Sequence, residues 1–268
     1  MNFKDKIILI TGTSNGIGKR LAIDLAHRGA VIVASGRSPE RLAAALSEIR
    51  RASPRSIAFR CDVGARDDVH AMVGNALDAF GAIDILINNA GIGMRKPFVE
   101  TPLETIEEIN RTNYLGAVYC THAVLPSMLA RGRGHIVNIS SIAGHIGTLN
   151  MAAYCASKFA MNGWSESLYH ELRPRGIHVS VVCPGPVKTD FNRSFAGSKP
   201  KSPEFMIISA ESVAQTVIGA IENQRFEVIT PRSLAAICAL KRFMPRLFRA
   251  ASQRAFRARA SAPDKPVA

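Results

Sequence analysis

The segment Ile7-Ile8-Leu9-Ile10-Thr11-Gly12-Thr13-Ser14-Asn15-Gly16-Ile17-Gly18 decides the fold of this chain. Its apolar start predicts a buried strand, and its glycines predict a tight turn that opens a helix. In such a turn Gly12 lets the chain bend, Gly16 lets the backbone approach a pyrophosphate, and Gly18 lets the helix pack closely. The helix N-terminus then attracts the phosphate charge. A tight turn without a ligand is the alternative, but the strand before and the helix after favour nucleotide binding.

Short apolar runs alternate with helix-length segments along most of the chain. The predicted strands are Ile7–Ile10, Val31–Ala34, Ile57–Phe59, Ile83–Ile87, His135–Ile139, His178–Val182 and Phe226–Ile229. The predicted helices are Ile17–Arg28, Pro39–Ala52, Arg66–Phe80, Leu103–Ala130, Met151–Arg173 and Ala210–Asn223. The strands lack polar alternation, which is typical of burial on both faces. This order predicts one α/β domain, a Rossmann-type, doubly wound parallel sheet of seven strands with helices on both faces. Such a sheet binds its ligand at the carboxyl ends of the strands.

The end of the second strand indicates which dinucleotide binds. A strand that binds NAD(H) usually ends in an acid that holds the ribose 2′-hydroxyl. Here the strand runs into Ser35-Gly36-Arg37, and an arginine can pair with a 2′-phosphate. This favours NADP(H) over NAD(H), and a solvated loop arginine is the alternative. Ser14 is also placed to contribute to phosphate binding.

Tyr154 and Lys158 lie four residues apart in a predicted helix and therefore share one face. A nearby ammonium stabilises a phenolate and lowers the tyrosine pKa from about 10, so that the phenol can act as acid or base at neutral pH. Alone, this pair is a common surface coincidence. Its surroundings argue otherwise, because polar segments end the neighbouring strands. These segments are Asn88–Gly91, Ser140–Ser141 and Pro184–Asp190.

In this order and spacing the chain resembles the short-chain dehydrogenase/reductase family, in its short dehydrogenase-type branch, over residues 5–230. The motifs that carry the resemblance are Thr11-Gly12-x-x-x-Gly16-x-Gly18, Asp62-Val63, Asn88-Asn89-Ala90-Gly91, Asn113, Ser141, Tyr154-x-x-x-Lys158 and Pro184-Gly185. The resemblance implies that Tyr154 is the general acid or base and that Lys158 holds the nicotinamide ribose and lowers the Tyr154 pKa. It further implies that Ser141 binds the substrate oxygen and that Asn113 orders a water for proton relay. Ser140 lacks the family's spacing to the tyrosine and is expected to be structural.

The resemblance also implies a cofactor site, in which Asp62 and Val63 meet the adenine and Thr189 lies near the carboxamide. The predicted cofactor residues are Gly12, Ser14, Asn15, Gly16, Ile17, Gly18, Arg37, Asp62, Val63, Asn89, Ala90, Gly91, Tyr154, Lys158, Pro184, Gly185, Val187 and Thr189. The irregular segment 191–205 is expected to be a substrate lid. Candidates for an apolar pocket wall are Met94, Phe98, Met151, Phe191, Phe195, Phe205 and Met206.

The C-terminal part of the chain differs from the rest in charge. Residues 232–268 carry nine Lys or Arg and one acid, so they supply +8 of the net charge of +13. We therefore divide the chain into a catalytic domain over 1–231, a basic amphipathic extension over 232–259 and a disordered tail over 260–268. The extension suits either an anionic membrane surface or packing on the domain or a partner. Nucleic acid is a less favoured partner.

The remaining composition excludes several classes of protein. No two cysteines have a metal-ligand spacing and no histidines pair, so the sequence predicts free thiols and no metal site. Neither a targeting segment nor a membrane span is recognisable, so we expect a cytoplasmic location, with peripheral membrane contact through the extension as the variant.

These observations predict an NADP(H)-dependent oxidoreductase that moves a hydride between its cofactor and a carbonyl or secondary alcohol. The basic extension favours an apolar substrate, such as a steroid-, lipid- or acyl-like compound. The resemblance implies a homodimer or homotetramer. The alternatives are a non-catalytic NADP-sensing protein and a membrane-associated binding protein on the same fold.

Overall fold

The computed structural model describes residues 2–189 and 206–260, and for 256–260 the backbone alone. Seven parallel strands form one sheet in the order β3-β2-β1-β4-β5-β6-β9. The strands are β1 (Ile7–Thr11), β2 (Val31–Gly36), β3 (Ile57–Arg60), β4 (Ile85–Asn88), β5 (Gly134–Ile139), β6 (Ile177–Pro184) and β9 (Glu227–Thr230). The predicted doubly wound sheet is therefore confirmed, and the strand order reverses between β1 and β4. That reversal is where this class of sheet opens a crevice for its ligand.

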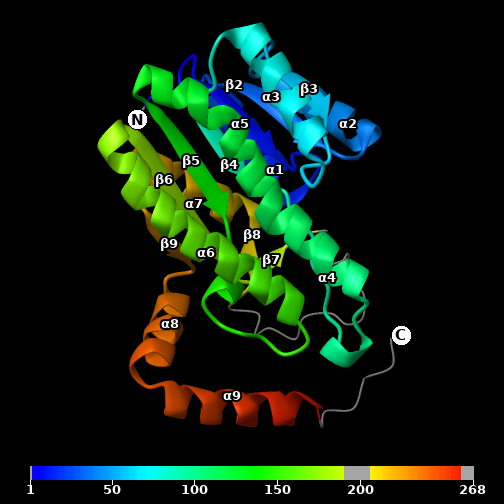
Figure 1. The fold of residues 1–268 in the computed structure, drawn as a ribbon, viewed down its shortest axis with the longest axis vertical. Helices are drawn as coiled ribbons and strands as arrows, with labels where there is room; N and C mark the ends of the chain where they lie inside the picture. The colour runs from blue at the N-terminus through cyan, green and yellow to red at the C-terminus, as the bar shows by residue number, and fades with distance from the viewer. Residues whose placement is uncertain (1, 190–205, 261–268) are drawn as a thin grey trace.

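Helices cover both faces of the sheet (Figure 1). One face packs against α1 (Gly16–His27), α2 (Pro39–Arg50) and α7 (Ala210–Glu222). The other packs against α3 (Arg66–Phe80), α5 (Gly116–Arg131) and α6 (Ala152–Leu172). Alternate residues of β1 serve the two cores, since Ile8 and Ile10 belong to the first and Ile7 and Leu9 to the second. This two-sided burial explains why the strand sequences are apolar without alternation.

The predicted helix over 103–130 is interrupted in the structure. It consists of α4 (Leu103–Asn110), a π-helical turn over Arg111–Leu115, and α5. A π-turn inserts an extra residue into the helical ladder and is frequent at functional sites. Apolar periodicity cannot reveal it, because the segments on either side keep the helical repeat.

Two short strands flank the segment that is predicted to be a lid. Strands β7 (Val187–Lys188) and β8 (Ile208–Ser209) pair in parallel and bring the two ends of that segment together. They were not predicted from the sequence, because each has only two residues. The segment 191–205 itself lies outside the described residues, as do Phe191, Phe195 and Phe205.

The basic extension forms two helices, α8 (Ser233–Phe243) and α9 (Pro245–Ala260). Pro245 begins the second helix, in the first position that tolerates proline. In Figure 1, α8 descends from β9 and α9 runs across the bottom of the view. Within the described chain, no helix is long and apolar enough to span a bilayer.

Candidate active site

The glycine turn after β1 is fixed by the neighbouring strand β4. Gly12 has a positive φ of 72°, and a Cβ there would lie 2.9 Å from the Ala90 Cα. The Asn89 amide donates from Nδ2 to the carbonyl oxygens of Thr11 and Gly12, over 2.9 and 3.1 Å. The Thr11 hydroxyl accepts from the backbone N–H groups of Asn89 and Ala90, each over 3.0 Å. Asn89, predicted as a cofactor residue, therefore holds the turn in shape.

Helix α1 starts in this turn and leaves its N-terminus open to the cavity. The Asn15 side chain makes no capping hydrogen bond, and the first turn contains no acidic residue. The free N–H groups and the positive helix end therefore suit an anionic group such as a pyrophosphate. Gly18 lies behind them, where a Cβ would sit 2.3 Å from the Gly12 carbonyl oxygen and 2.4 Å from Asn89 Nδ2. The helix can approach the strands this closely because Gly18 has no side chain.

Two arginines stand where the ribose 2′ position of a bound dinucleotide is expected. Arg37 and Arg41 are exposed and line the cavity together with Ser38, the N-cap of α2. Arg37 makes a long ion pair of 3.7 Å with Glu108, in which both side chains are about half exposed. The Ser14 hydroxyl is buried, with no hydrogen-bond partner among the described residues. Ser38 and Arg41 were not predicted from the sequence, although their positions at the start of α2 were a usable signal.

One large cavity runs across the carboxyl edge of the sheet, with a volume of about 820 Å³. All the predicted cofactor residues line it except Gly18, whose place is behind the glycine turn. The volume is within the range of small-molecule and cofactor sites. The structure thus gathers residues from the first turn, the ends of β2 to β6 and helix α6 around a single space.

Tyr154, Ser141 and Lys158 lie next to one another in the lining of this cavity. The hydroxyl groups of Tyr154 and Ser141 are hydrogen-bonded to each other. Ser141 is held by its own loop, because its Oγ accepts from the Ala143 N–H over 3.1 Å. The Lys158 Nζ lies 5.8 Å from the centre of the Tyr154 ring and donates to the Ile139 carbonyl over 2.8 Å. A phenol, a hydroxyl and an amine therefore face one substrate-sized space.

The structure corrects the expected pKa of Tyr154. Burial raises the pKa of this phenol to about 12, and the hydrogen bond from Ser141 opposes that rise only in part. Burial also lowers the pKa of Lys158 to about 8. The expected lowering of the Tyr154 pKa is absent in this arrangement of the chain, where desolvation dominates and the Lys158 amine bonds the Ile139 carbonyl. Tyr154 is protonated at neutral pH.

Asn113 lies in the π-turn and is fully buried. Its side chain accepts from the Ile92 N–H over 2.8 Å and donates to the Ile92 carbonyl over 2.9 Å. Nδ2 also donates to the Ser157 hydroxyl over 3.0 Å. Gly91 lies between Asn113 and Lys158, since a Cβ there would be 3.2 Å from Oδ1 and 3.9 Å from Nζ. Asn113 therefore fixes the loop beside Lys158 and does not line the cavity.

The two neighbouring serines have different surroundings. Ser140 is buried, and its hydroxyl donates to the Asn162 side-chain oxygen over 2.5 Å. Both serines border the cavity, but it is Ser141 that bonds Tyr154. Ser140 is therefore tied to helix α6, and Ser141 faces Tyr154 in the cavity.

The apolar wall of the cavity differs in part from the prediction. Met151 and Met206 line it as expected, while Met94 and Phe98 border a separate small hollow that Met151 also touches. Phe98 is 64% exposed and does not line the large cavity. Leu234 of α8 lines the large cavity and was not predicted, because sequence alone does not show where the extension docks.

Many known proteins are similar in sequence to this chain. Residues 6–199 match the profile of the short chain dehydrogenase family. The chain is 40% identical over 225 residues to a ketoacyl reductase, HetN, from Nostoc sp., covering 84% of this chain and 78% of that protein. It is 34% identical over 249 residues to epidermal retinol dehydrogenase 2 of Mus musculus, covering 91% and 80%.

Two solved structures bound to different dinucleotides are also similar. One is a short chain dehydrogenase/reductase from Burkholderia phymatum in complex with NAD, with a TM-score of 0.85 and 26% identity, covering 100% of this chain and 99% of that one. The other is a metagenomic short-chain oxidoreductase in complex with NADP, with a TM-score of 0.74 and 31% identity, covering 85% and 97%. The fold therefore accommodates either dinucleotide.

Proposed function

Because this chain belongs to the short chain dehydrogenase family of oxidoreductases, we propose that it is an NADP(H)-dependent carbonyl reductase or alcohol dehydrogenase. The observation that carries the proposal is the meeting of Tyr154, Ser141 and Lys158 in the cavity that also contains the glycine turn. When bound, the dinucleotide would supply or accept the hydride, and the chain would position both reactants. The substrate would be a carbonyl compound or a secondary alcohol.

The chain's own residues would handle the substrate oxygen and its proton. In reduction, Tyr154 would donate its phenolic proton to the carbonyl oxygen as that oxygen gains negative charge. Ser141 would donate a hydrogen bond to the same oxygen and stabilise its developing charge. Because burial raises its pKa, the Tyr154 phenol holds its proton throughout the neutral range and enters the reaction in the acid form. In oxidation the phenolate form would be needed as the base.

Lys158 and Asn113 would assist this proton transfer without bonding the substrate oxygen themselves. The Lys158 ammonium would hold the nicotinamide ribose, which requires it to share or leave the Ile139 carbonyl. We propose Asn113 as a positioning residue for a proton-relay water, because its amide fixes Ile92 and it lies beside Gly91 and Lys158. Asp62 and Val63 border the cavity where we place the adenine.

The preference for NADP(H) rests on the charge beside β2. Arg37 and Arg41 offer two guanidinium groups, and the buried Ser14 hydroxyl offers an unused hydrogen bond. The end of β2 and the residue after it, Ala34–Arg37, include no acid that could bind a ribose 2′-hydroxyl. A 2′-phosphate suits these donors better than an uncharged hydroxyl, because charge-assisted bonds to arginine are the stronger ones.

The test is an assay of wild type and Arg37→Ala with NADPH and with NADH. We expect wild type to oxidise NADPH in the presence of apolar ketones or aldehydes. We expect Arg37→Ala to raise the Kd for NADPH by about 10- to 100-fold, since a bond to a charged group contributes about 1.5–3 kcal/mol. The Kd for NADH should stay within about twofold. Equilibrium binding by NAD(P)H fluorescence measures both constants.

Arg133→Ala is the control for net charge, because Arg133 is also exposed and follows α5, outside the cavity lining. Equal losses for the two dinucleotides in Arg37→Ala would remove the argument for NADP(H). A carbonyl panel of steroids, acyl compounds, ketones and aldehydes addresses the substrate. If NADPH binds and none of these compounds is reduced, the non-catalytic NADP-sensing protein becomes the better interpretation.

We also propose that α9 contacts anionic membranes peripherally, in an otherwise cytoplasmic protein that forms a homodimer or homotetramer. Phe243, which ends α8 just before α9, is 78% exposed, Leu247 of α9 is 52% exposed, and exposed arginines lie beside them in the sequence. Such a mixture suits an anionic bilayer surface, where each basic residue contributes about 1 kcal/mol. Sedimentation velocity tests the proposed oligomer against a monomer.

Vesicle co-sedimentation tests the membrane contact with an Arg246→Glu/Arg249→Glu double variant. We expect wild type to pellet with phosphatidylserine-containing vesicles at low salt, less at high salt, and little with phosphatidylcholine alone. The double variant should pellet at least about 10-fold less, since reversing two charges removes more than 2 × about 1 kcal/mol. NADPH affinity serves as its folding control. Equal pelleting of both proteins would contradict the membrane role of α9.

A further inference from the structure

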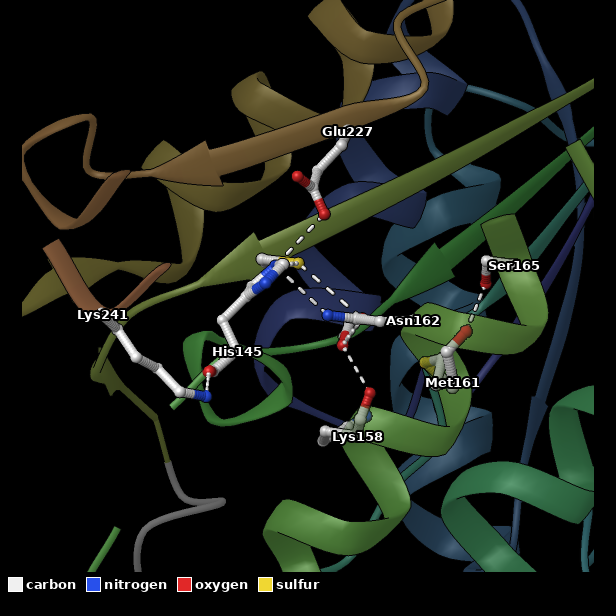
Figure 2. A network of polar contacts seen from close by, with 9 residues as sticks. His145, Lys158, Met161, Asn162, Ser165, Glu227 and Lys241 are labelled. Carbon is white, nitrogen blue, oxygen red and sulfur yellow. Dashed lines mark hydrogen bonds and ion pairs between the residues drawn. The ribbon is translucent and has the colours of Figure 1, made fainter. Parts of the chain in front are cut away.

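A cluster of three metal-ligand side chains lies beside the cavity. His145 follows the loop that carries Ser141, Cys183 is in β6, and Glu227 begins β9. The His145 Nε2 is 3.1 Å from a Glu227 carboxylate oxygen and 3.5 Å from the Cys183 Sγ. All three ligand atoms lie within 4.8 Å of one another. Figure 2 shows the imidazole between the Glu227 carboxylate and Asn162 of helix α6.

These separations fit a tetrahedral cation. With Zn–N of about 2.05 Å, Zn–O of about 2.1 Å and Zn–S of about 2.3 Å, a tetrahedron places N and O about 3.4 Å apart and N and S about 3.6 Å apart. The observed distances of 3.1 and 3.5 Å agree with these edges. The edge between sulfur and carboxylate, which is at most 4.8 Å, needs to close to about 3.6 Å, by rotation of the Glu227 side chain, which is 39% exposed.

The neighbours of His145 Nε2 make incompatible demands on this nitrogen, because one requires a proton there and another requires a lone pair. The Glu227 carboxylate requires a proton on this nitrogen, but the Asn162 Nδ2, which lies 3.2 Å away, is itself a donor and requires a lone pair. The Cys183 thiol also faces the same atom. One nitrogen cannot present a proton to the carboxylate and a lone pair to the amide together. A cation on the lone pair would attract the carboxylate and the sulfur, and the Asn162 amide, which Ser140 holds through its oxygen, would then no longer bond the imidazole.

We propose that His145, Cys183 and Glu227 bind one zinc-type divalent cation through Nε2, Sγ and a carboxylate oxygen, with water in the fourth position. On binding, the Cys183 S–H bond breaks, a metal–sulfur bond forms, and the proton goes to solvent. The thiolate and the carboxylate then cancel the two positive charges. This neutrality matters because Lys158 is close enough to Cys183 to act on the pKa of that thiol. An uncompensated cation at the same place would repel the Lys158 ammonium.

The site would be structural, behind the proposed catalytic groups. His145 ends the turn that begins at Ser141, and Cys183 immediately precedes Pro184 in the cavity wall. The ligands also connect to α6, because Asn162 bonds Ser140 and faces His145. A cation here would join three segments whose side chains face the substrate space. The exposed fractions of His145 and Glu227, 24% and 39%, leave an entry path from solvent.

The test uses the full-length protein, stripped with a chelator and titrated with Co²⁺, whose spectrum reports both thiolate ligation and geometry. We expect one equivalent to bind, with a thiolate-to-cobalt charge-transfer band and the visible bands of tetrahedral cobalt. Zn²⁺ should displace it. Cys183→Ser should lose the charge-transfer band. Glu227→Gln removes a ligand charge at a partly exposed position and should weaken Co²⁺ binding by at least about 100-fold, the upper range for losing a group outside the ligand shell.

Two controls separate this site from adventitious binding. Cys238→Ser removes a thiol on α8 that influences the Cys183 pKa but is not one of the three ligands. His70→Asn removes an exposed histidine on α3. Both variants should keep the wild-type spectrum and affinity. The proposal is overturned if wild type shows no charge-transfer band, if the band survives in Cys183→Ser, or if Glu227→Gln binds Co²⁺ as wild type does. The readout does not depend on turnover, so it is independent of the proposed enzymatic function.

Discussion

Replacing Tyr154 with phenylalanine is expected to lower kcat for carbonyl reduction by about 10³-fold, within the usual contribution of a general acid. The variant keeps the ring that fills the wall of the cavity and loses only the phenolic proton that the substrate oxygen needs. Its Kd for NADPH should stay within about twofold, because the phenol is proposed to bond the substrate oxygen and the ring that lines the cavity remains. Stopped-flow NADPH oxidation and fluorescence titration measure the two quantities.

Tyr169→Phe is the matched control in the same helix. The Tyr169 hydroxyl accepts a hydrogen bond from Arg173 over 2.9 Å at an exposed position and does not line the cavity. Its kcat should equal that of wild type. If Tyr154→Phe keeps more than about a tenth of wild-type turnover, Tyr154 is not the acid, because even the weaker general acids contribute about 10²-fold.

Gly18→Ala is expected to lower kcat/KM by about 100-fold, although the glycine does not touch the cavity. Its Cβ would lie 2.3 Å from the Gly12 carbonyl oxygen and 2.4 Å from Asn89 Nδ2, so the turn or the helix must shift by about an ångström. Misplacement of this size commonly costs about 10²-fold in rate. Overpacking should also lower the free energy of unfolding by about 1–3 kcal/mol. Steady-state kinetics and urea denaturation test both effects.

Gly74→Ala is the control for adding a methyl group to a helix. Gly74 lies inside α3 with nothing within 4 Å of an added Cβ. This variant should be more stable than wild type by about 0.5–1 kcal/mol, since alanine favours a helix more than glycine does. Normal kinetics for Gly18→Ala would mean that the close approach at the turn is not needed for the cofactor.

The sheet and the grouping of the candidate site were predictable from sequence for the same reason. Buried parallel strands have a recognisable apolar signature, and their carboxyl ends must meet at one edge. Residues as far apart in the chain as Gly12, Ser141 and Pro184 could therefore be assigned to one edge of the sheet from the sequence alone. Arg37 was found in the same way, because it follows directly from the end of β2.

Other properties depend on contacts that no local pattern contains. The raised pKa of Tyr154 follows from how completely the fold buries it, whereas the spacing to Lys158 suggested a lowered one. The π-turn at Asn113 keeps the apolar repeat on both sides and so leaves no trace in it. The cluster of His145, Cys183 and Glu227 joins three separate elements with no motif spacing.

The packing of α8 against the cavity bears on how substrate selectivity can be changed. Leu234 forms part of the cavity wall, and Lys241 donates to the His145 carbonyl while its ammonium lies 4.8 Å from the Phe159 ring. Helix α8 is thus built into the wall of the cavity that Ser141, Tyr154 and Lys158 also line. Exchanging α8 between homologues would therefore change the shape of the cavity wall without replacing Ser141, Tyr154 or Lys158. A tag fused after α8 should be designed so that it does not disturb this contact.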